Sequence, residues 1–143
     1  MGENYLDHVV INVKDDMDLA QLVFSNLGFT LTPRGYHTLG SINHLMMFGS
    51  DYMELIGFPE HGVANNPNAR PDLTTAPFGI NGLVFKSSDV DKTFEKLVEL
   101  EMDGDPPKSF SRPVELDGRK TDAKFRTVTV SYTHLTLPTR LMV

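Results

Sequence analysis

The sequence of 143 residues contains no cysteine, which excludes disulfides, thiolate metal sites and cysteine nucleophiles. It also has no apolar run near the roughly 18 residues that a membrane-spanning helix needs. The N-terminus, MGENYLDHVV, lacks the basic region of a signal peptide, and Leu6 breaks the myristoylation pattern. From these absences we expect a soluble protein of the cytoplasm.

An excess of positive charge is missing too. The chain has 13 lysines and arginines against 19 aspartates and glutamates, a net charge of −6, and no basic run. This balance argues against nucleic acid and anionic membranes as partners. With 40% hydrophobic and 22% charged residues, the composition is ordinary for a folded protein, and the length suits one compact domain.

The first part of the sequence predicts elements in the order β-α-β-β-β. A β-rich run is followed by Asp15 and Asp16, which can cap a helix, by apolar residues at helical spacing, and by Gly28 as a helix stop. Two later apolar runs joined by Gly49-Ser50-Asp51 predict a hairpin. The expected elements are strand 6–13, a helix with Leu19, Leu22, Val23 and Leu27 on one face, strand 29–32, loop 33–41, and strands 42–48 and 52–58.

The second part repeats this order less completely. Residues 59–78 are rich in Asn and Pro without a period, so we expect a linker or covering loop. The elements expected after it are strand 80–86, a helix capped by Asp89, and strands 110–116 and 124–130. The domain therefore divides into module one at about 5–58, module two at about 79–130, and an atypical tail at 131–143.

The two parts match each other at an offset of about 74 residues. Residues 9–11 align with 83–85, and Asp15 aligns with Asp89 at the start of each helix. One such unit has too little core to stand alone, and pairing two would complete it. We predict burial between helices and sheet for Val9, Ile11, Leu22, Val23, Leu55, Leu83, Phe85, Phe94 and Leu97.

His8 and Glu54 are the strongest candidates for chemistry. Side chains alternate along a strand, so His8 points away from the first helix if Val9 and Ile11 face it, and Glu54 does the same from strand 52–58. If these strands are neighbours, the two groups project together. Imidazole and carboxylate are ordinary ligands of zinc, iron or manganese, and Glu54 could instead act as a general base.

The hairpin register decides which further residue joins this face. A three-residue loop would put His44 beside Glu54 as an additional metal ligand, whereas a two-residue loop would put Asn43 there as a residue that binds the substrate. The sequence does not choose between these registers.

Three other residues are candidates for binding a substrate. One shares the face of Glu54, one lies in a loop that can cover a pocket, and one belongs to a basic cluster that could attract an anion or could form a solvated strand edge. They are, in that order, Tyr52, His37 and Arg126.

This layout resembles the vicinal oxygen chelate superfamily, and more closely its glyoxalase-like domains. The resemblance is carried by LDHVV at 6–10, LGF at 27–29 and YMELI at 52–56, with 79–86 and 119–130 similar to the second module. It covers roughly residues 5–130. It implies an α+β fold in which paired βαβββ modules form a curled mixed sheet around a cavity, with the second module truncated here.

The resemblance also implies a function. In that superfamily metal ligands come from the first and last strands of each module, and His8 and Glu54 match the two places in module one. The third place falls on Gly82, which has no side chain, and the fourth lies on a strand that the sequence does not reveal. The expected function is a metal-assisted lyase, isomerase or dioxygenase acting on a small molecule, with zinc, iron, manganese or nickel as cofactor and Glu54 as catalytic residue. The alternatives are a metal-free binding protein of the bleomycin-resistance type and an inactive truncated module.

The tail, SYTHLTLPTRLMV, does not continue the superfamily pattern. We expect that a natural C-terminus has been lost, and that Tyr132 to Leu137 pairs poorly or not at all with the sheet, because Pro138 tolerates only an edge position. A sheet that lacks its last strand exposes unpaired backbone groups. We therefore predict self-association, with a homodimer as the simplest product.

Overall fold

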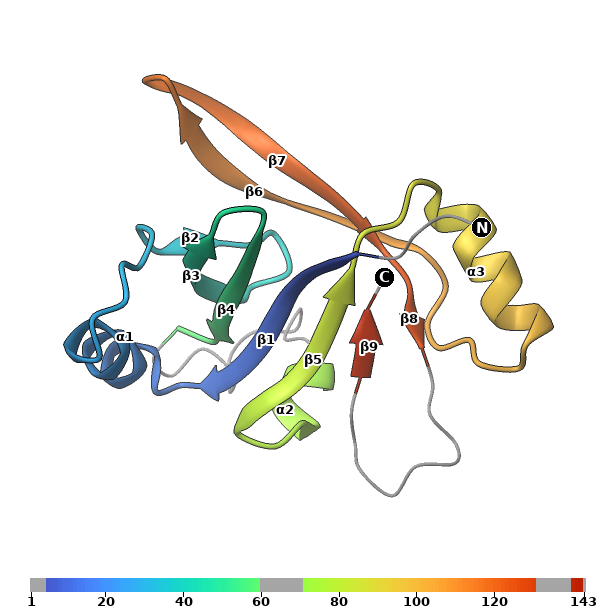
Figure 1. Cartoon of the computed structure of the whole chain (residues 1–143), viewed down its shortest axis with the longest axis horizontal. Coiled ribbons are helices and arrows are strands. Elements are labelled where there is room, and N and C mark those ends of the chain that lie inside the picture. The colour runs from blue at the N-terminus through green and yellow to red at the C-terminus, as the bar shows by residue number, and fades with distance from the viewer. Residues whose placement is uncertain (1–4, 60–70, 131–139, 143) are drawn as a thin grey trace.

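The computed structural model describes residues 5–59, 71–130 and 140–142. Its elements follow the order of two successive modules, as Figure 1 shows. They are β1 (Leu6–Lys14), α1 (Met17–Asn26), β2 (Gly35–Tyr36), β3 (Ile42–Phe48), β4 (Asp51–Gly57), α2 (Pro71–Thr75), β5 (Gly79–Phe85), α3 (Val90–Glu99), β6 (Lys108–Leu116), β7 (Arg119–Thr127), β8 (Thr129–Val130) and β9 (Arg140–Met142).

The strands form one mixed sheet and one separate hairpin. The sheet has the order β2-β3-β4-β1-β5-β9-β8, and β6 pairs only with β7. In Figure 1 the β6–β7 hairpin crosses above the half of the sheet that contains β1 and β4, while α1 and α3 lie at opposite ends of the molecule. The predicted α+β fold with a curled mixed sheet is confirmed.

The two modules meet along β1 and β5, which pair antiparallel. In module one β4 runs parallel to β1, and in module two β9 runs parallel to β5. The predicted half-length repeat is therefore present in the topology. The second module is shortened, because β9 has three residues where β4 has seven. Tyr132 to Leu137, for which poor pairing was predicted, lies outside the described residues, and self-association stays a prediction.

Two local predictions were wrong. Residues 29–32 are not a strand, although the backbone N–H of Thr32 donates to the carbonyl of Leu45 in β3 at 2.9 Å. The segment 59–78 was expected to be a linker or loop, yet it contains α2, whose Leu73 is buried with Val10, Ile56, Phe58 and Val84. Leu73 is the only large apolar side chain within α2, whose sequence is PDLTT, so no hydrophobic periodicity predicts this helix.

The predicted burial holds for two residues of the sheet and fails for two residues of α1. Ile11 and Leu55 are buried, but Leu22 and Val23 are 58% and 44% exposed. The helix turns Met17, Ala20 and partly Phe24 toward the sheet instead. These residues also recur at helical spacing, so α1 carries two apolar stripes, and periodicity alone cannot tell which one packs inward.

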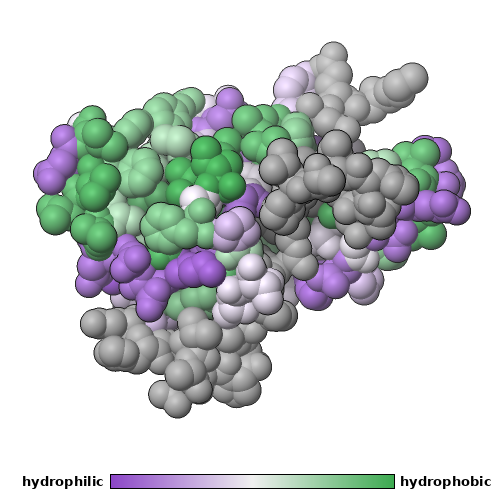
Figure 2. All heavy atoms as spheres, turned by 90° about the horizontal axis from the view of Figure 1, so that it is seen from below, coloured by the Kyte–Doolittle hydropathy of each residue, from purple (hydrophilic) through white to green (hydrophobic). Residues whose placement is uncertain are grey.

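The outward stripe of α1 consists of Leu19, Leu22, Val23 and Leu27, all exposed. Figure 2 shows hydrophobic side chains gathered at the end of the molecule where α1 lies. Of the other predicted core residues, Val9, Leu83, Phe85, Phe94 and Leu97 are half-buried. No described helix is long and apolar enough to cross a membrane.

Candidate functional site

Parallel pairing of β1 with β4 brings His8 and Glu54 together. The register sets His8 opposite Tyr52 and Val10 opposite Glu54, so both polar side chains rise on the face away from α1. His8 Nε2 lies 3.3 Å from Glu54 Oε2, and both residues are buried. The face argument made from sequence alternation therefore places these two groups as the structure has them.

The hairpin register adds Asn43 to this pair. Phe48 pairs with Asp51, which leaves a two-residue loop, and Leu45 pairs with Glu54. This is the register that puts Asn43 on the face of Glu54. The Asn43 amide Nδ2 donates to Glu54 Oε1 at 2.6 Å. Each oxygen of the carboxylate thus faces a nitrogen.

The same register sends His44 to the opposite face. Its Nδ1 lies 2.7 Å from the carbonyl oxygen of Thr32, and its Nε2 accepts from Arg34 Nε at 3.2 Å. Both ring nitrogens are therefore engaged on the α1 side of the sheet. The structure does not bring His44 together with His8 and Glu54.

Two further predicted residues line the same site. The Tyr52 ring stacks on the His8 ring, with centroids 4.4 Å apart. His37 Nε2 lies 3.5 Å from Asn43 Nδ2, and its Nδ1 lies 2.9 Å from Ser41 Oγ. A polar chain therefore runs from His8 through Glu54 and Asn43 to His37, across β1, β4 and β3.

Sequence reasoning missed Asp7, which holds the other side of the His8 ring. Its Oδ2 lies 2.8 Å from His8 Nδ1, so this nitrogen donates, because an ionised carboxylate only accepts. Neighbouring residues of a strand ordinarily point to opposite faces. Here the pairing of β1 with β5 shifts register between Leu6 and His8, and this irregularity lets Asp7 lie beside the ring.

These residues form part of the wall of a cavity of about 570 Å³. The sheet contributes His8, Asn43, Tyr52 and Glu54, and the β6–β7 hairpin closes the other side with Phe110, Arg112 and Phe125. The loop before β3 is tied to the hairpin, because the Thr38 N–H donates to the carbonyl of Ser111 at 3.0 Å. His37 thereby comes to lie edge-on against Phe110, with ring centroids 5.8 Å apart.

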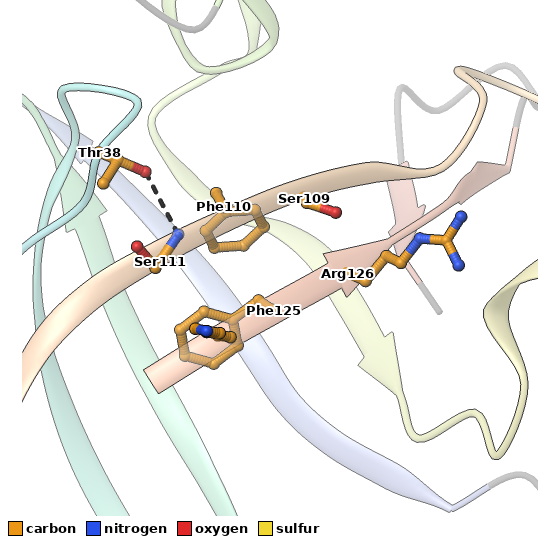
Figure 3. A pocket seen from close by; sticks show the side chains of 7 residues that line it. Thr38, Ser109, Phe110, Ser111, Phe125 and Arg126 are labelled. Carbon is orange, nitrogen blue, oxygen red and sulfur yellow. Dashed lines mark hydrogen bonds between the residues drawn. The ribbon is translucent and has the colours of Figure 1, made fainter. Parts of the chain in front are cut away.

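Arg126 is bound to a neighbouring helix. Its guanidinium forms a two-pronged ion pair with the Asp91 carboxylate of α3. Figure 3 shows the Arg126 side chain extending away from Phe110 and Phe125. These three residues line a hollow of about 490 Å³ and also belong to the wall of the larger cavity. The main contact of Arg126 is therefore structural, and its predicted role in binding a substrate stays a prediction.

Opposite charges hold the pair ionised. Burial raises the pKa of Glu54, but His8, the Asn43 donor and the charge of His37 outweigh it, and the net pKa lies below 4.5. Burial lowers the pKa of His8, but Glu54 and Asp7 outweigh it, and the net pKa lies above 6.5. The pKa of Tyr52 is raised by burial and by the carboxylates of Glu54 and Asp7, so it remains a neutral phenol.

These shifts predict how the pair stabilises the metal-free chain as pH changes. The raised pKa of His8 gives a stabilisation that is complete below pH 6.5 and is lost as pH rises through the folded value. The lowered pKa of Glu54 gives one that is present above pH 4.5 and is lost as pH falls through the folded value. We therefore expect the unmodified chain to exceed His8→Gln in free energy of unfolding by an amount that decreases above pH 6.5. Denaturant unfolding with a chelator present measures this difference. A difference that stays constant over that range would contradict the charge assignment.

The sequence matches the glyoxalase-like domain family over residues 6–141. The chain belongs to this family. A search of curated proteins finds no match.

Solved structures with the same fold have low sequence identity to this glyoxalase-like domain. A hypothetical protein from Staphylococcus aureus superposes with a TM-score of 0.71 at 16% identity, and the match covers 98% of this chain and 58% of that one. Methylmalonyl-CoA epimerase from Mycobacterium tuberculosis gives 0.60 at 18% identity, covering 96% and 84%. A mutant of 4-hydroxymandelate synthase from Streptomyces coelicolor gives 0.58 at 17% identity, covering 99% and 38%. The fold is thus that of the vicinal oxygen chelate proteins, and the family has enzymes among its structural relatives.

The donor pair of this glyoxalase-like domain suits a metal ion. Two ligands that each bond one ion at about 2.1 Å lie about 3.0–3.4 Å apart at octahedral or tetrahedral angles, and His8 Nε2 and Glu54 Oε2 are 3.3 Å apart. Asp7 on His8 Nδ1 is the outer-sphere partner that metal-bound histidines ordinarily have. In the described part of the chain no group of three His, Asp or Glu residues completes the set. Gly82, at the third place, lies opposite Val10 and offers no side chain.

Proposed function

We propose that the chain is a glyoxalase-like enzyme that acts on a small molecule and holds a divalent metal through His8 and Glu54. The observation that carries this proposal is the 3.3 Å separation of His8 Nε2 and Glu54 Oε2 in the wall of a cavity of about 570 Å³. The reaction is of the lyase, isomerase or dioxygenase type. The remaining positions around the ion would be open to water or to an oxygen of the substrate.

The residues around the pair have separable tasks. Asp7 fixes the orientation of the His8 ring through Nδ1, and Asn43 fixes the Glu54 carboxylate through Oε1. Tyr52 stacks on His8 and shields one face of the ring from water. Where Glu54 holds no metal, it stays ionised, and its Oε2 can instead accept a proton from a molecule bound in the cavity. A bound divalent ion would supply Lewis-acid polarisation of a substrate oxygen.

The test of this proposal is metal affinity in two matched histidine variants. We expect His8→Gln to weaken the binding of Mn²⁺, Ni²⁺ or Zn²⁺ by more than about 100-fold, since losing even an outer-sphere partner costs about 10- to 100-fold. His44→Gln removes an equally buried histidine from the opposite face and should leave affinity within about threefold of the unmodified chain. Titration calorimetry gives the affinities, and thermal unfolding verifies that each variant is folded.

A metal-free binding protein is the second candidate. The observation that favours it is Gly82, because the residues that the structure describes then supply two ligands where metal sites ordinarily have at least three. If this alternative holds, the unmodified chain will bind none of the three ions. His8→Gln will then show no difference from it in metal binding. A small apolar ligand would then still bind in the cavity of both proteins.

A further inference from the structure

Arg112 occupies the cavity face of the β6–β7 hairpin. In the hairpin register Arg112 pairs with Ala123 and Phe110 pairs with Phe125, and all four line the cavity. Side chains alternate along β7, so Arg126 belongs to the other face, where it reaches Asp91. Of the two arginines in the cavity wall, Arg112 is thus the one that register directs inward.

The Arg112 guanidinium lies at the same end of the cavity as the His8–Glu54 pair. A β-carbon at Gly35 would lie 2.7 Å from Arg112 Nη1 and 2.3 Å from Asn43 Oδ1, so both groups pack on the same glycine. Asn43 in turn donates to Glu54. The positive charge of Arg112 also acts on Tyr52. It lowers the pKa of this phenol, whereas burial, Glu54 and Asp7 raise it.

The charge of Arg112 has no partner among the residues that the structure describes. Over residues 5–59 and 71–130, no ion pair or side-chain hydrogen bond engages the Arg112 guanidinium, although the residue is half-buried. Two other cations in the cavity wall are paired: Arg126 with Asp91, and Lys86 with Asp7 at 3.6 Å. The carboxylates that face the cavity are satisfied in their turn, Glu54 by His8 and Asn43, and Asp7 by His8 and Lys86. A half-buried guanidinium without an anion costs free energy that a ligand anion would recover.

The rest of the cavity wall is largely apolar. Phe110 and Phe125 stack with centroids 5.1 Å apart, and Leu45, Met47 and Val84 face them from the sheet. A guanidinium binds a carboxylate or a phosphate with two parallel hydrogen bonds. Lys124, the remaining cation of the wall, lies by alternation on the same face of β7 as Arg126. Arg112 is thus the inward-directed cation without a partner among the described residues. One cation close to two carboxylates favours a singly charged carboxylate, because a doubly charged phosphate would be repelled more strongly by Asp7 and Glu54.

We propose that the cavity binds an organic acid whose carboxylate pairs with Arg112 and whose hydrocarbon part packs on Phe110 and Phe125. This proposal rests on the cavity being the functional site and names the substrate class for it. The carboxylate end of the acid would then lie next to the His8–Glu54 pair.

The probes are phenylacetate and its uncharged amide, phenylacetamide, measured by calorimetry with a chelator present so that no metal can bind the carboxylate. Arg112→Gln should weaken phenylacetate binding at least tenfold, because a hydrogen bond to a charged group contributes about 1.5–3 kcal/mol. Binding of phenylacetamide should change less than twofold. Arg112→Lys keeps the positive charge but cannot form the two parallel hydrogen bonds of a guanidinium. It should therefore give an intermediate loss of phenylacetate affinity.

The matched control is Arg119→Gln, which removes one positive charge from the far end of the same hairpin, outside the cavity wall. It should leave both affinities unchanged. Equal loss of acid and amide binding in Arg112→Gln, an unaffected phenylacetate affinity, or no binding of phenylacetate to the unmodified chain would overturn the proposal. Tighter binding of phenyl phosphate than of phenylacetate would contradict the choice of a carboxylate. Because these measurements are made without metal, they can fail while metal binding by His8 and Glu54 holds, and the reverse.

Discussion

Gly35→Ala should disrupt the candidate site by adding a single methyl group. The new β-carbon would lie 2.3 Å from Asn43 Oδ1 and 2.7 Å from Arg112 Nη1, both far inside van der Waals contact. Arg112 can swing aside because its side chain is long, but Asn43 is short, buried and held by Glu54 at 2.6 Å. We expect the Asn43–Glu54 hydrogen bond to break. Overpacking of this kind lowers the free energy of unfolding by about 1–3 kcal/mol.

Gly35→Ala should also lower metal affinity by about 10- to 100-fold. Asn43 is not a metal ligand itself, but it orients the ligand Glu54. Denaturant unfolding and metal titration measure the two effects. Tyr36→Ala is the control, because it alters the neighbouring position of β2, whose side chain is 60% exposed. Unchanged stability and metal affinity in Gly35→Ala would show that Asn43 does not position Glu54.

Glu54→Gln should have the largest effect on function. The carboxylate accepts on both oxygens, from Asn43 at Oε1 and toward His8 at Oε2. Glutamine has one acceptor and one donor end, so while His8 is protonated the amide nitrogen faces another donor in either orientation. We expect metal binding to become undetectable and the free energy of unfolding to fall by about 1–3 kcal/mol, the cost of an unsatisfied buried group.

Glu115→Gln is the matched control, since it makes the same change at an exposed position of β6. It should alter neither quantity. If Glu54→Gln bound Mn²⁺, Ni²⁺ or Zn²⁺ as tightly as the unmodified chain does, Glu54 could not be a ligand.

Strand alternation and the resemblance to the vicinal oxygen chelate superfamily carried the sequence-based prediction of this site. That prediction required the first strand and strand 52–58 to be neighbours, which element order alone does not establish. The structure pairs β1 with β4 in parallel, and this pairing makes the faces of His8 and Glu54 coincide. The choice between Asn43 and His44 could not be made, because one residue more or less in the hairpin loop reverses every face of β3. Asp7 could not be predicted either, since it depends on a register shift in β1.

Arg112 shows a different kind of limit. Phe110 and Arg112 are two positions apart on β6, so the sequence already places them on the same face of the strand. It does not reveal that the β6–β7 hairpin leaves the main sheet and turns that face toward β1, β3 and β4. The prediction of which face of α1 is buried was wrong for a related reason. The helix has two apolar stripes, and only tertiary packing decides which one faces the sheet. The stripe that faces the sheet contains Met17, Ala20 and Phe24, and the exposed one contains Leu19, Leu22 and Val23.

The most direct test of the central claim is anomalous diffraction from crystals of the unmodified chain saturated with Mn²⁺. The account predicts one anomalous peak about 2.1 Å from both His8 Nε2 and a carboxylate oxygen of Glu54, with Asp7 still on His8 Nδ1. Saturated crystals that show no peak between these two residues, with the His8 ring still in direct contact with the Glu54 carboxylate, would contradict it.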